Sequence, residues 1–131
     1  DLEDQIIMEP WVPYREVPKY IMAADICLLP AYRNDVMMNI VPIKMYEYMA
    51  AGKPVLATSL PGIMEEFGET NGVIYAESSE AILDRAIELI ENGNIHREGD
   101  KARNFVKPIS WDALTDAFQE TLSKGMTSRL V

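Results

Sequence analysis

The chain is poor in the residues that form covalent and metal cross-links. Its 131 residues include one cysteine and one histidine. A single cysteine cannot form an intramolecular disulfide. Cys27 lies in the apolar run at 26–29, where we expect a buried, unreactive thiol. Zinc sites need several Cys or His ligands, so His96, in a polar segment, is expected at the surface. The sequence predicts no metal site and no bound cofactor.

Basic residues are also scarce. The chain has 12 Lys and Arg against 21 Asp and Glu, a net charge of −9. Nucleic acids and anionic membranes attract basic surfaces, so this charge argues against both as partners. No apolar run approaches the roughly 20 residues that cross a bilayer. Any anionic ligand must therefore be held by local features of the fold.

The size and composition of the chain suit a single globular domain. Hydrophobic residues make up 48% and charged residues 25%, which is ordinary for such a domain, and this length can enclose a core. The chain opens on Asp1 and enters an apolar run almost at once. We therefore expect residues 1–131 to be one domain of a longer protein.

Short apolar runs alternate with helical patterns along the chain. The runs are almost continuously apolar, as expected for strands buried on both faces of a parallel sheet. Their alternation with helices predicts a Rossmann-like parallel α/β sheet of about four strands with flanking helices. Ligands in such sheets bind at the carboxyl ends of the strands. The predicted strands are 5–8, 26–29, 55–58 and 72–75. The predicted helices are 17–24, 42–51, 63–67, one that is capped at 78–79 and closed by the Asn-Gly pair at 92–93, 95–106 and 111–122. The candidate ligand loops are 9–16, 30–41, 59–62 and 76–79.

One of these helices carries two charges in an otherwise apolar sequence. Pro42 suits the first turn of a helix, and Gly52, with a proline two residues later, is a strong stop. We expect the helix to be buried. Lys44 and Glu47 are three residues apart and share a side, and buried charges need partners. They either pair with each other, at only about 0.2–0.5 kcal/mol, or bind a ligand.

Several stretches of the chain share their order and residue types with one family. They are the segments 6–13, 20–25 and 26–30, the helix-and-strand segment 42–55, the segments 58–62 and 71–72, and the Ser-Trp pair at 110–111. Together they resemble the second half of the C-terminal domain of group 1 glycosyltransferases, family-4-like retaining enzymes with the GT-B fold. The resemblance covers nearly the whole chain and is strongest around Glu47.

The resemblance implies a two-domain enzyme that moves a sugar from a nucleotide-sugar to an acceptor with retention. This chain would be most of the donor-binding domain. Glu47 would accept hydrogen bonds from the ribose hydroxyls, a task that suits an ionised carboxylate. The backbone of Val41, Ile43 and Lys44 would bind the diphosphate at the helix N-terminus. Asn39, which stands where the family has the first of two glutamates, would contact the transferred sugar.

Asn39 is the main departure from the family pattern. Its amide brings no charge, so the donor sugar and full catalytic competence stay open, and a plain turn residue is the other interpretation. Asp35 is a candidate substitute for the missing acid. Lys44 can instead extend to solvent. The nucleobase is expected near the turn at 11–13, and the tyrosines that flank Glu47 are expected to pack in the core.

The resemblance also implies parts and partners outside this chain. These are an N-terminal domain of the same protein, expected to hold the catalytic residues, and a glycan, lipid-linked or small-molecule acceptor. The chain alone is then expected to be inactive, and the enzyme cytoplasmic or peripheral at the inner face of the membrane. Two rival functions remain: a non-catalytic GT-B-like binding module and a GT-B sugar-nucleotide epimerase, which needs no acceptor.

Overall fold

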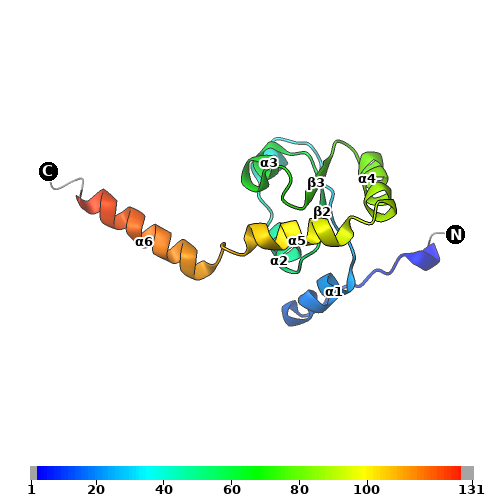
Figure 1. The fold of residues 1–131 in the computed structure, drawn as a ribbon, viewed down its shortest axis with the longest axis horizontal. Coiled ribbons are helices and arrows are strands. Elements are labelled where there is room, and N and C mark those ends of the chain that lie inside the picture. The colour runs from blue at the N-terminus through cyan, green and yellow to red at the C-terminus, as the bar shows by residue number, and fades with distance from the viewer. Residues whose placement is uncertain (1–2, 128–131) are drawn as a thin grey trace.

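The computed structural model describes residues 3–127, in which helices flank a three-stranded sheet in the order β1-β2-β3. Strand β1 (Cys27–Leu29) pairs in parallel with β2 (Val55–Thr58), and β2 pairs in parallel with β3 (Val73–Ala76). The predicted fold class, a Rossmann-like parallel α/β sheet, is confirmed (Figure 1). The helices are α1 (Val17–Ala23), α2 (Ile43–Ala50), α3 (Pro61–Phe67), α4 (Ser79–Glu91), α5 (Ile95–Val106) and α6 (Trp111–Thr127), with short 3-10 helices η1 (Glu3–Gln5), η2 (Tyr14–Glu16) and η3 (Met37–Asn39).

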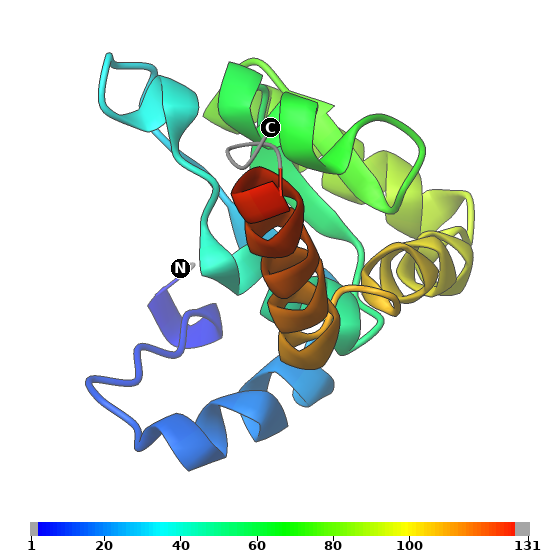
Figure 2. The same ribbon diagram turned by 90° about the vertical axis from the view of Figure 1, so that its left-hand side faces the viewer.

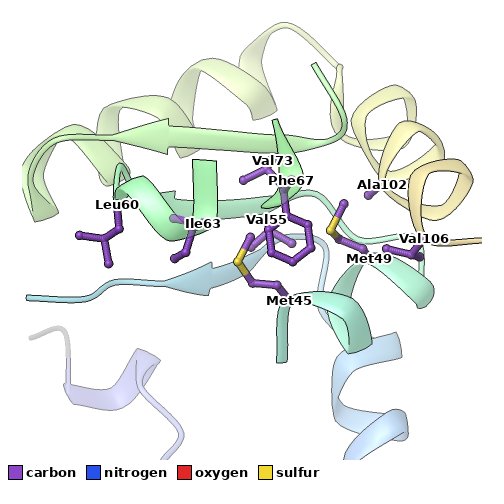
Figure 3. Close-up of a cluster of buried hydrophobic side chains, with 10 residues drawn as sticks. Met45, Met49, Val55, Leu60, Ile63, Phe67, Val73, Ala102 and Val106 are labelled. Atoms are coloured by element: carbon purple, nitrogen blue, oxygen red, sulfur yellow. The ribbon is translucent and has the colours of Figure 1, made fainter. Parts of the chain in front are cut away.

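Strand β2 is buried on both of its faces. Its residues alternate: Val55 and Ala57 join one apolar cluster, and Leu56 joins another with Ile82 and Leu89 of α4. This two-sided burial explains why the sequence of the strand is apolar without a break. The first and larger cluster combines side chains from the sheet, α2, α3 and α5 (Figure 3), namely Met45, Met49, Val55, Ala57, Leu60, Ile63, Phe67, Val73, Ala102 and Val106.

Helix α5 covers one side of this larger cluster and packs very closely against the residue that precedes β3. The ring of Phe67 lies between Tyr46 of α2, at 4.9 Å, and Phe105 of α5, at 6.0 Å between ring centroids. Gly72, which precedes β3, has a φ of +80°. A Cβ atom added there would stand 2.3 Å from the carbonyl oxygen of Glu98. Only glycine satisfies both conditions without strain.

The predicted strand at residues 5–8 is wrong. Gln5 ends η1, residues 6–8 form no regular structure, and Ile7 and Met8 are 85% and 84% exposed. An apolar run becomes an internal strand only when other elements cover both its faces. Here the following helix, α1, buries only Ile21 in the body. The described sheet therefore ends at β1.

Helix α2 is less buried than its sequence predicts. Met45 and Met49 are fully buried, whereas Ile43 is 65% exposed and Lys44 is also exposed. The difference arises because only one face of the helix contacts the sheet and α5. The opposite face, which starts with Ile43, is covered only in part, where Glu47 meets the Tyr14 hydroxyl.

Helix α6 projects from the rest of the molecule (Figure 1) and is viewed nearly along its axis in Figure 2. The predicted cap is present, since the Ser110 hydroxyl accepts a hydrogen bond from the amide of Ala113 at 3.1 Å. The predicted apolar stripe is exposed: Trp111 is 79% and Phe118 63% accessible. None of the helices in residues 3–127 has the combination of length and apolarity that a bilayer crossing requires.

Candidate functional site

The five predicted site residues lie along one continuous stretch that leads into and through α2. Asn39 ends η3, Val41 lies in the connection to α2, and Ile43 and Lys44 are the first two residues of the helix. These four side chains are exposed, and Glu47, one turn further on, is half-buried. The residues predicted to contact the diphosphate and the ribose therefore lie just before α2 and in its first turns.

The opening turn of α2 leaves backbone donors available. Pro42 caps the helix in an extended conformation and offers no side-chain hydrogen bond. Its carbonyl accepts from the amide of Met45 at 3.1 Å. The amides of Ile43 and Lys44 have no acceptor among the described residues. Free amides and the positive end of the helix dipole together favour an anion at this position.

Glu47 has a partner that the sequence did not indicate. The hydroxyl of Tyr14 donates a hydrogen bond of 2.9 Å to Glu47 Oε1. This bond, together with the charge of Glu47, raises the pKa of Tyr14. Lys44 forms no ion pair with Glu47 in the described residues. The alternative of a simple pair within the helix is therefore wrong.

The Tyr14–Glu47 hydrogen bond lies beside a small, mostly apolar cavity between α1 and α2. Its volume is about 280 Å³, and side chains of α1, including Val17, Ile21 and Met22, form one wall. Tyr14 belongs to the predicted ligand loop 9–16, which follows no strand but still reaches Glu47. The expected nucleobase position at 11–13 immediately precedes Tyr14.

The segment that carries Asn39 is held by backbone packing. Asn34 starts the turn, since its side-chain oxygen accepts from the amide of Met37 at 2.9 Å. At the other end, a Cβ on Gly62 would lie 2.9 Å from the carbonyl carbon of Asn39. Gly62 therefore lets η3 rest directly on α3 and fixes the backbone of Asn39 while its side chain stays exposed. Asp35, the candidate substitute, is exposed on the same loop.

The other residues considered as candidates from the sequence lie in the core or at the surface. Tyr46 and Tyr48 pack against the larger core cluster, as predicted. Burial, with a hydrogen bond to Glu66, raises the pKa of Tyr46 to about 12. Cys27 is 7% exposed and burial raises the pKa of its thiol, and His96 is at the surface as predicted.

Acidic and metal-binding side chains are dispersed in this structure. Across residues 3–127, no three His, Cys, Asp or Glu side chains gather so as to hold a metal ion. The chemistry of the α2 opening is instead that of backbone amides and one carboxylate. Such a set can bind an anion and orient neighbouring hydroxyl groups.

Comparison with known proteins identifies related sequences. AmsK of Erwinia amylovora, an amylovoran biosynthesis glycosyltransferase, is 38% identical over 66 residues, which are 50% of this chain and 16% of AmsK. WcaL of Salmonella typhimurium, whose name assigns it to colanic acid biosynthesis as a glycosyltransferase, is 34% identical over 90 residues, 66% of this chain and 22% of WcaL. TuaH of Bacillus subtilis, named for teichuronic acid biosynthesis, is 40% identical over 47 residues, 36% of this chain and 12% of TuaH.

The matched part of the chain thus spans between 12% and 22% of the length of these relatives. No solved structure matches the chain significantly. The family described as glycosyl transferases group 1 matches residues 1–92, which is more than half of the chain. That match includes β1, α2, β2, α3 and β3, hence every predicted site residue. The resemblance is therefore confirmed at the level of the family: the chain belongs to the group 1 family of glycosyl transferases.

Proposed function

We propose that this chain binds the nucleotide-sugar donor of an enzyme that transfers a sugar to a glycan, lipid-linked or small-molecule acceptor. Family membership and three relatives whose names make them glycosyltransferases of amylovoran, colanic acid or teichuronic acid biosynthesis support glycosyl transfer. An N-terminal domain of the same protein would supply the catalytic residues and the acceptor site. Retention at the anomeric carbon and a cytoplasmic or inner-membrane location belong to the same proposal.

The proposal rests on two features of α2. Backbone amides in its first turn have no hydrogen-bond acceptor in the described chain, and a carboxylate one turn later uses only one of its two oxygens. The amides of Ile43 and Lys44 lack acceptors within the described chain. One turn further on, Glu47 uses Oε1 to accept from Tyr14. Its second oxygen, Oε2, has no partner among residues 3–127 and can accept from a ribose hydroxyl. In the proposed complex the diphosphate uses these amide donors and the ribose uses this carboxylate acceptor, as the family resemblance implies.

In this proposal each group has a defined role in the reaction. The α2 opening stabilises negative charge that develops on the leaving diphosphate, and this requires no metal ion. Glu47 holds the ribose and thereby orients the donor, with Tyr14 fixing its rotamer. Val41 contributes its backbone beside the phosphates. Asn39 donates to or accepts from a hydroxyl of the transferred sugar, without the charge that a glutamate would bring.

Calorimetry with UDP and GDP on the intact protein tests the donor site. We expect Glu47→Ala to weaken nucleotide affinity roughly tenfold or more, since hydrogen bonds to a charged group are lost. Glu65→Ala is the matched control, because Glu65 is an exposed acid on α3 outside the site. Unchanged affinity in Glu47→Ala, or an equal loss in the control, would remove Glu47 from the site.

Product analysis separates glycosyl transfer from its two rivals. A glycosylated acceptor with release of nucleoside diphosphate supports the transferase. An altered nucleotide-sugar or a free sugar, formed without acceptor, would identify an epimerase. Tight nucleotide binding without turnover of any nucleotide-sugar would instead identify a binding module, with Asn39 marking the lost chemistry.

A further inference from the structure

The side chain of Tyr14 is exposed, yet its hydroxyl makes a directed contact with the carboxylate of the candidate site. Tyr14 is 76% accessible, so its ring buries little apolar area against the body. Its hydroxyl nevertheless donates to Glu47 Oε1 at 2.9 Å, across 33 positions of the chain. Core packing therefore does not account for the position of this hydroxyl.

The chain holds the Tyr14 hydroxyl in place from both sides of η2. The amide of Glu16 donates to the carbonyl of Pro13 at 2.8 Å and closes the turn that contains the tyrosine. Helix α1 follows at once, and its end is tied to the body because the Lys53 ammonium donates to the carbonyl of Met22 at 2.9 Å. The hydroxyl is thus presented to α2 by a turn and a helix that are both fixed to their neighbours.

No other polar side chain lines the cavity at this contact. The cavity of about 280 Å³ between α1 and α2 is lined by Tyr14, by Glu47 and otherwise by apolar residues. A ligand hydroxyl that enters this cavity therefore meets these two polar side chains and apolar walls.

The hydrogen bond between Tyr14 and Glu47 leaves acceptors on both residues and no donor on either. The tyrosine hydroxyl has one proton, which it gives to Oε1, and its oxygen keeps its lone pairs. An ionised carboxylate has no proton to give, and Oε2 has no partner within residues 3–127. The hydrogen bond and the charge of Glu47 raise the pKa of Tyr14, so the proton stays on the tyrosine at neutral pH.

These neighbouring acceptors select the chemistry of the ligand group. Two adjacent hydroxyl donors, such as the 2′- and 3′-hydroxyls of a ribose, can each give a proton to one of them. An ionised phosphate offers only acceptor oxygens, whose lone pairs and charge repel those of the carboxylate. The pair thus fits a vicinal diol and does not fit an anion.

We propose that Tyr14 is a donor-binding residue that recognises the ribose together with Glu47. The oxygen of Tyr14 accepts a hydrogen bond from one of the two vicinal hydroxyls, and Oε2 of Glu47 accepts from the other. This role rests on the donor site proposed above and deepens it, because it assigns a second side chain to the ribose. It also makes the site selective for ribonucleotides over deoxyribonucleotides.

Calorimetry on the intact protein with UDP, 2′-deoxy-UDP and 3′-deoxy-UDP tests this role, or the guanosine series if GDP binds more tightly than UDP. We expect each deoxy analogue to bind the wild type about fivefold more weakly than UDP, because one acceptor is left unpaired. Tyr14→Phe keeps the ring and removes only the hydroxyl. It should weaken UDP binding about fivefold and abolish the penalty for one deoxy analogue, while the penalty for the other remains.

The matched control is Tyr20→Phe, because Tyr20 is an exposed tyrosine on α1 that does not line the cavity. It should leave all three affinities unchanged, and a loss as large as that in Tyr14→Phe would overturn the role of Tyr14. A loss in Tyr14→Phe by one common factor for UDP and both analogues would show that the hydroxyl only supports the local fold. That result also overturns the proposal.

Glu47→Ala, measured in parallel, separates this role from the donor site itself. If Glu47→Ala weakens UDP binding and Tyr14→Phe changes none of the three affinities, the donor site stands and the role of Tyr14 is wrong. If neither substitution changes the affinity for any nucleotide, the donor site and the ribose contact are both wrong. Loss of a single deoxy penalty in Tyr14→Phe supports both.

Discussion

The sheet body and the two ends of the chain are equally apolar in sequence but differ sharply in burial. In the body, from β1 to α5, Leu56 and Phe67 are completely buried. At the ends, Met8 is 84% and Trp111 79% exposed. In the body, apolar side chains are buried between the sheet and the helices on its two faces, whereas at the ends they are exposed to solvent (Figure 1).

The difference shows that apolar residues are buried only where other elements of the fold pack against them. Strand β2 has α2 and α5 beyond one face and α4 against the other. Residues 6–8 have no such cover, and α6 extends away from the other described elements (Figure 1). Folding free energy should therefore reside in the body, and the site proposed above lies on its rim.

The largest expected effect comes from replacing one phenylalanine in each region. Phe67→Ala should lower the free energy of unfolding by about 3–5 kcal/mol, the usual cost of a cavity in a packed core. Phe118→Ala, on α6 and 63% exposed, should change it by less than about 0.5 kcal/mol. Urea denaturation followed by circular dichroism measures both. Equal losses would show that α6 contributes to the folded core and that the division into two regions is wrong.

The next test separates backbone strain from packing at two glycines. Gly72 and Gly93 both have positive φ angles, +80° and +65°. A Cβ on Gly93 meets nothing within 4 Å, whereas on Gly72 it collides with α5. Gly93→Ala should cost about 1–2 kcal/mol from the left-handed conformation alone. Gly72→Ala should cost a further 1–3 kcal/mol or so from overpacking. Thermal unfolding of the two variants measures the difference between their losses of stability. Equal losses would show that α5 does not pack closely against the residue before β3.

Local signals predicted most elements of the body but not the contacts between them. The bounds of α5 match the polar helix predicted at 95–106. Strand prediction failed at 5–8, where the apolar run lacks cover. The Tyr14–Glu47 hydrogen bond joins residues 33 positions apart, and no local pattern encodes such a distance. The functional roles of Glu47 and Asn39 stay predictions, since they depend on a ligand.

Helix caps provide a smaller test in both regions. The hydroxyls of Ser78 and Ser110 each accept from an amide three residues on, in α4 and α6. Ser78→Ala should lower global stability by about 1 kcal/mol, because α4 is packed on the sheet. Ser110→Ala should leave global stability unchanged and reduce only helicity near Trp111, since α6 unfolds locally. Amide hydrogen exchange distinguishes the two responses, and a global effect of Ser110→Ala would mean that α6 is coupled to the core.

The smallest effect is expected where the N-terminal end meets the body, at Tyr14 and Glu47. The hydrogen bond to Glu47 and its charge raise the pKa of Tyr14, so this contact is fully present below the ordinary tyrosine pKa. It is lost as the pH rises through the raised value. Glu47→Gln should therefore lower the pKa of Tyr14 toward the ordinary range, and Glu65→Gln should not.

Ultraviolet titration at alkaline pH measures this shift if Tyr14→Phe serves as the reference for subtraction. Tyr46 and Tyr75 do not obscure it, because burial is the main cause that raises the pKa of each to about 12. Suppose that Glu47→Gln leaves the Tyr14 titration unchanged. The two regions then do not touch at this point in solution, and a donor entering the α2 site would meet a free Glu47 carboxylate. A lowered pKa instead means that the exposed end already holds Glu47 in one rotamer before any nucleotide arrives.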